Sequence, residues 1–102
     1  MIRHTVVFKL KHESNSAAEH QFLEQARKLK SLPTVLNFEC LQQISRKNHF
    51  THGLSMEFAN DEAYQAYNEN PLHIAFVKDY WLLEVEDFLE IDYLISDKKG
   101  EI

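Results

Sequence analysis

Three histidines occupy positions where a side chain able to accept a proton would be useful. His4 and His52 fall in patterns otherwise filled by apolar residues, and His73 follows a proline at the start of a helical turn. Burial disfavours a charged imidazole, and a neutral one can act as a general base when a carboxylate or carbonyl fixes its tautomer. We expect Asp92 to be that partner for His73, which predicts a hydrogen-bonded pair capable of proton abstraction.

Each of these side chains also has a plainer interpretation. A histidine on an apolar strand face is commonly a hydrogen-bonded core residue, and His52 in particular fits that description. Tyr64 and Tyr67 lie three residues apart, so a helix places them on one side. They either pack in the core with their hydroxyl groups at its rim, or direct a phenol toward a ligand.

Other kinds of catalytic site lack support in the sequence. Cys40 is the single cysteine and no pair of histidines has the spacing of a zinc motif, so we expect no metal. A GxSxG nucleophile motif is absent, and two glycines are too few for a phosphate-binding or dinucleotide-binding loop. We therefore expect no cofactor.

Charge and hydrophobicity indicate which kinds of partner the protein can bind and in which compartment it is located. The net charge is −5, with 16 acidic and 11 basic residues, and such a field repels nucleic acid. Lys9 and Lys11 interrupt the first apolar run, and five acidic residues break the last one, so neither a signal peptide nor a membrane span is expected. We expect a cytoplasmic protein with no membrane partner.

The elements that position these side chains follow from periodicity. Apolar residues alternate over 2–11, 35–44, 50–58 and, less regularly, 85–95, which predicts four strands. Irregular alternation in the last segment is typical of a strand near an edge or a functional cavity.

Capping signals mark the helices. Ser16 and Glu19 form a capping box that opens a helix over 16–31. Asn60 caps a second helix, which Asn70 and Pro71 interrupt and restart before an aromatic turn at 80–81.

The order strand, helix, two strands, helix, strand is the ferredoxin-like β-α-β-β-α-β motif of the α+β class, with both helices on one face of a four-stranded antiparallel sheet. No element remains to cover the other face, and the chain is rich in large apolar residues, with 44% hydrophobic residues and 7 Phe. We expect a second copy to cover that face in a homodimer. The domain is expected over 1–96, with a polar tail over 97–102.

Several segments resemble one known family. The opening strand with His4, the segment 50–52, the run from Tyr67 to His73 and the ending Ile91-Asp92-Tyr93 are together similar to the stress-responsive A/B barrel domain (Dabb) family. The resemblance spans nearly the whole chain. It implies a dimeric α/β barrel in which two four-stranded sheets face each other.

The resemblance also implies roles for single residues. A plant polyketide cyclase of this family uses a strand histidine, a helix tyrosine and a Pro-x-His histidine held by an aspartate. Matched by motif, these catalytic roles fall on His4, Tyr67, His73 and Asp92, with Phe22 as a ligand contact. His52 belongs to a matching strand segment, and we expect it to contact a ligand as well.

Two functions remain open from the sequence. The first is a stress-related or small-molecule-binding homodimer with no assigned reaction, holding a small carbonyl-containing or aromatic ligand between sheet and helices. The alternative is a cofactor-independent lyase, isomerase or polyketide-cyclase-like enzyme, in which His73 and Asp92 remove a proton next to a carbonyl. The enzyme requires a pocket that reaches His73, and such a pocket would also suit the binding protein.

Overall fold

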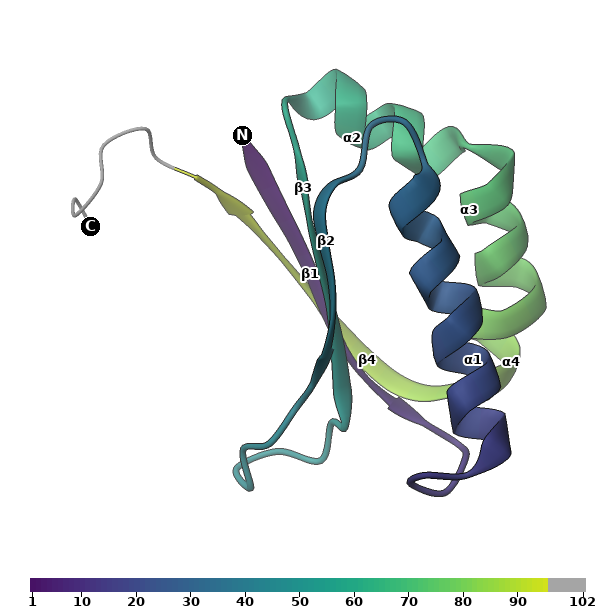
Figure 1. Ribbon diagram of the computed structural model, residues 1–102. Helices are drawn as coiled ribbons and strands as arrows, with labels where there is room; N and C mark the ends of the chain where they lie inside the picture. Colours follow the sequence, from purple (N-terminus) through teal and green to yellow (C-terminus); the bar gives the residue numbers. More distant parts are fainter. Residues whose placement is uncertain (96–102) are drawn as a thin grey trace.

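The computed structural model describes residues 1–95, so the expected tail at 97–102 lies outside the described residues. Its sheet has four antiparallel strands in the order β2-β3-β1-β4, as Figure 1 shows. The strands are β1 (Ile2–Leu10), β2 (Leu36–Gln42), β3 (His52–Phe58) and β4 (Val85–Leu94). The predicted ferredoxin-like α+β fold is confirmed.

The first two helices begin where the capping residues predicted. Helix α1 (Ala17–Arg27) starts after Ser16, whose Oγ accepts the backbone N–H of Glu19 at 3.2 Å, and a 3-10 turn, η1 (Lys28–Ser31), continues it. Helix α2 (Asp61–Glu69) starts after Asn60, whose side chain accepts the N–H of Ala63.

The last helical region is longer than the sequence suggested. Helix α3 (Pro71–Phe76) starts after Asn70, then continues through a π-helical turn, η2 (Val77–Trp81), into α4 (Leu82–Glu84). The expected aromatic turn at 80–81 is therefore wrong. No glycine or proline follows Pro71 in this segment, so nothing local stops the helix before β4 begins.

All helices lie on one side of the sheet (Figure 1), and the core fills the space between them. Strand β1 buries alternate residues against the helices, namely His4, Val6, Phe8 and Leu10. His4 therefore points inward, which agrees with its place in the apolar pattern of this strand. Phe8 is fully buried and its ring lies 5.0 Å from that of Trp81, measured between ring centroids.

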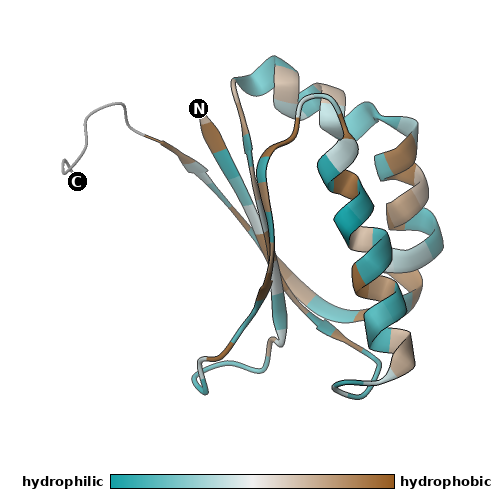
Figure 2. Cartoon of the chain, viewed as in Figure 1, coloured by the Kyte–Doolittle hydropathy of each residue, from teal (hydrophilic) through white to brown (hydrophobic). Residues whose placement is uncertain are grey.

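The opposite face of the sheet is left without a covering element among residues 1–95. Hydrophobic and hydrophilic residues alternate along the strands (Figure 2). The pairing of Thr5 with Ile91 and of Val7 with Leu89 places these residues side by side on this open face. Ile91 and Leu89 are 41% and 50% exposed, so this face presents large apolar side chains to solvent.

Candidate functional site

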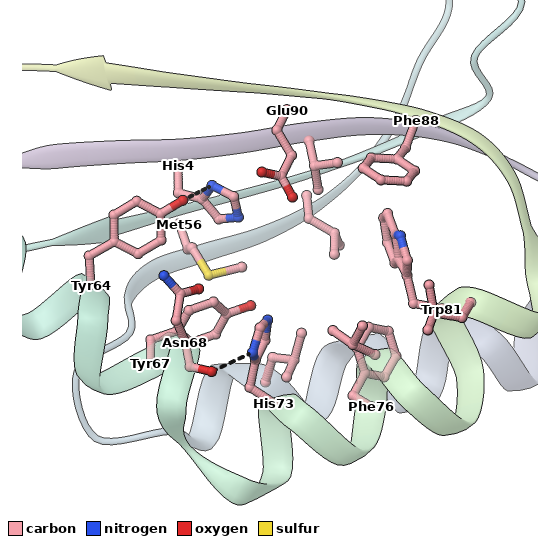
Figure 3. Close-up of a pocket in the computed structure, with 15 residues that line it drawn as sticks. His4, Met56, Tyr64, Tyr67, Asn68, His73, Phe76, Trp81, Phe88 and Glu90 are labelled. Atoms are coloured by element: carbon pink, nitrogen blue, oxygen red, sulfur yellow. Dashed lines mark hydrogen bonds between the residues drawn. The ribbon is translucent and has the colours of Figure 1, made fainter.

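A cavity of about 330 Å³ lies between the sheet and the helices. Figure 3 shows that one end of this cavity is lined by aromatic rings and the other by polar side chains. Aromatic rings of Phe76, Trp81 and Phe88 line one end, and His4, Tyr67 and His73 gather at the other. Elements far apart in sequence supply these groups: β1 and β4 from the sheet, and α2, α3 and η2 from the helical layer.

His4 is held by two partners at the polar end. Its Nδ1 lies 2.6 Å from Oδ1 of Asp92 and 2.8 Å from the hydroxyl oxygen of Tyr64, and that hydroxyl donates to Oδ2 of Asp92 at 2.9 Å. A carboxylate only accepts, so Nδ1 carries the proton that it donates to Asp92. The other ring nitrogen, Nε2, is left on the pocket side (Figure 3).

His73 is held differently. Its Nδ1 donates to the backbone carbonyl of Asn68 at 3.3 Å, which leaves Nε2 facing the cavity (Figure 3). Burial lowers the pKa of His73, against an opposing effect of the Asn68 hydrogen bond. The ring of Tyr67 lies 4.3 Å away between centroids, and burial raises the pKa of that phenol. His73 is therefore a neutral imidazole with a free acceptor nitrogen.

The expected pairing of His73 with Asp92 is wrong in this structure. Asp92 contacts His4 and Tyr64 instead, because the antiparallel register of β1 and β4 places Asp92 directly opposite His4 on the helix-facing side. Tyr67 does lie beside His73, as expected. The sequence alone does not show that Asp92 lies opposite His4 in the sheet, so it cannot decide which of the two histidines contacts the Asp92 carboxylate.

Phe22 and His52, the expected ligand contacts, do not line this cavity. Phe22 is 1% exposed and packs its ring against Phe8 and Phe76. His52 stacks on Phe8, its Nδ1 lies 2.9 Å from the hydroxyl oxygen of Thr51, and its Nε2 lies 3.8 Å from a carboxylate oxygen of Glu19. Both residues belong to the packed core.

Burial lowers the pKa of His52, although the nearby Glu19 carboxylate opposes this. A histidine with a lowered folded-state pKa takes up a proton more readily when unfolded, so stability falls as pH drops below the unfolded value of about 6.5. When the pH is lowered from 7 to 5, we expect the free energy of unfolding to fall less for His52→Gln than for the wild type. Urea unfolding at several pH values measures this, with the exposed His20→Gln as control. Parallel curves for wild type and His52→Gln would contradict the assignment.

Two polar residues of the cavity were not singled out by the sequence. Asn68 supplies the carbonyl for His73, and Glu90 points into the cavity from β4 (Figure 3). The irregular alternation of the last strand was a signal for Glu90, since Phe88, Glu90 and Asp92 all face the helices. Within residues 1–95 no cluster of three potential metal ligands is present.

Comparison with known proteins gives one family and many related structures. The family model described as Stress Responsive A/B Barrel Domain matches residues 2–95. A Dabb family protein with a ferredoxin-like fold from Mesorhizobium loti is 54% identical, with a TM-score of 0.91 and coverage of 93% of this chain and 96% of that one. Among curated proteins no match is found.

Two more distant structures share the fold. A hydroxynitrile lyase from Passiflora edulis is 17% identical with a TM-score of 0.82, covering 95% of this chain and 94% of that one. A dimeric protein of unknown function from Bacteroides fragilis is 20% identical with a TM-score of 0.71, covering 92% and 95%. At these identities the likeness extends to the fold alone.

Proposed function

The chain belongs to the stress responsive A/B barrel domain family, and we propose that it binds a small, partly aromatic molecule in the cavity between its sheet and its helices. One observation carries this: Nε2 of His4 and Nε2 of His73 both face a cavity of about 330 Å³ whose other end is aromatic. A size near 300 Å³ and a few convergent polar groups on an apolar wall are typical of ligand sites.

The polar end suits a carbonyl or hydroxyl group. Tyr67 can donate its hydroxyl hydrogen, since its raised pKa keeps the phenol protonated, and the neutral imidazole of His73 can accept a hydrogen bond. The aromatic end, with Trp81 and Phe88 in edge-to-face contact at 5.5 Å between centroids, suits a flat apolar group. A substituted phenol or aromatic ketone fits both requirements.

We also propose that two copies of the chain pair through the open sheet face. The apolar residues on that face, Val7, Leu89 and Ile91 among them, support this, as do fold relatives described as dimeric. The helices described in residues 1–95 include none with the length and apolar character of a membrane span. A location in the cytoplasm stays a prediction.

A second candidate function rests on the state of His73. A neutral imidazole with its Nδ1 hydrogen donated to a carbonyl and its Nε2 free is suited to remove a proton from carbon next to a carbonyl. Tyr67, beside it, could donate a hydrogen bond to the enolate oxygen. This is the cofactor-independent lyase, isomerase or cyclase chemistry considered from the sequence, with His73 now acting without Asp92.

The test of the binding proposal is a titration of the protein with 4-ethylphenol, followed by NMR. We expect saturable binding with a Kd of about a millimolar, as for a small fragment in a partly apolar site. Val77→Phe, at the cavity wall, should abolish binding by filling the space. Leu83→Phe, on an exposed helix position, is the matched control and should bind normally.

Binding that survives Val77→Phe unchanged would contradict the proposal. Chemical conversion of a carbonyl probe that depends on His73 would favour the second function.

A further inference from the structure

Among residues 1–95, Glu90 is the one acidic side chain that lines the cavity. It lies opposite Val6 in the β1–β4 pairing, on the helix-facing side of the sheet. Figure 3 shows its carboxylate directed into the cavity from β4, between His4 and Phe88. Neither of the two functions proposed above uses it.

Within the described part of the chain no lysine or arginine lines the cavity, and its histidine His4 is already paired with Asp92. Among residues 1–95, Glu90 has no hydrogen-bond or ion-pair partner, in contrast with Asp92, which His4 and Tyr64 hold. His73 is neutral because burial lowers its pKa. The cavity therefore presents one unbalanced negative charge to whatever enters it.

The charge of Glu90 affects the pKa values of two neighbouring groups, Tyr67 and His73. It adds to the effect of burial in raising the pKa of Tyr67, and it partly offsets the effect of burial on the pKa of His73. Glu90 is thus close enough to act electrostatically on the polar end. The aromatic faces of Trp81 and Phe88 at the other end also favour a cation over an anion.

From this arrangement we propose that Glu90 makes the cavity selective for ligands that carry a protonated amine, and that it excludes carboxylates of the same shape. The inference rests on the proposed binding function and names its ligand class: an aromatic group with an ammonium on a short chain. The ring would occupy the aromatic end and the ammonium would pair with Glu90.

Three probes with one hydroxyphenyl body test the charge preference: tyramine, neutral 4-ethylphenol and 3-(4-hydroxyphenyl)propionate. In NMR titrations at low salt we expect tyramine to bind about 10-fold more tightly than the propionate, as one partly solvated ion pair allows. Glu90→Gln should bring the two affinities to within about 2-fold of each other. Glu86→Gln removes the same charge from β4 outside the cavity, and should keep the wild-type order.

The salt dependence of binding to the wild-type protein tests the same charge preference without a substitution. Raising the salt concentration should reduce the preference of the wild-type protein for tyramine, since solvent-exposed charges are screened. If the three probes bind equally, or if Glu90→Gln keeps the order, the role of Glu90 is refuted while the binding site stands. If none of the three binds to the wild type, the proposed function itself fails.

Discussion

Replacing Phe8 by alanine is expected to lower the free energy of unfolding by about 3–5 kcal/mol, the typical cost of emptying a fully buried phenylalanine site. Phe8 is 0% exposed at the centre of the sheet and contacts the rings of Phe22, Trp81 and His52. A loss of this size is a large part of the roughly 5–15 kcal/mol that stabilises a natural domain. Urea unfolding followed by tryptophan fluorescence measures it.

The neighbouring strand offers a matched control. Phe88 pairs with Phe8 across β1 and β4 but is 46% exposed, so Phe88→Ala should cost only about 1 kcal/mol. Equal losses for the two variants would contradict the difference in burial between Phe8 on the central strand β1 and Phe88 on the edge strand β4.

The second large effect concerns assembly. We expect the protein to sediment at twice its chain mass of 12.1 kDa, and Ile91→Glu to reduce it to a monomer at the same micromolar concentration. The reason is that Ile91 lies on the open sheet face, where a second copy would bury the new carboxylate without a partner. Analytical ultracentrifugation gives both masses.

The same change on the helical side serves as the control. Ile74 is exposed on α3, away from the open face, so Ile74→Glu should leave the dimer intact. A wild-type monomer, or a dimer that tolerates Ile91→Glu, would remove the proposed interface.

The fold could be predicted from the sequence because its signals are local. Alternation in β1 placed His4 inward, and Ser16, Asn60 and Asn70 marked the starts of three helices. The helical continuation from Val77 to Glu84 was missed, since aromatic and β-branched residues there resemble a turn or strand as much as a helix.

The site was predictable only in part. His4, Tyr67 and His73 line one cavity, but their hydrogen-bond partners depend on strand register and helix position, which the sequence does not show. Asp92 was assigned to the wrong histidine for this reason. Glu90 is not predicted from the sequence, because the irregular alternation of β4 indicates a nearby cavity without showing which of its acidic residues faces inward.

The most direct test of the proposed binding function is to locate a bound probe. With 4-ethylphenol bound, we expect intermolecular NOEs from its ring and ethyl protons to the methyl group of Met56 and the indole of Trp81, both of which line the cavity. NOEs confined to Leu72 and Tyr80, in a separate hollow between α1 and the α3 region, would place the probe elsewhere and contradict the account.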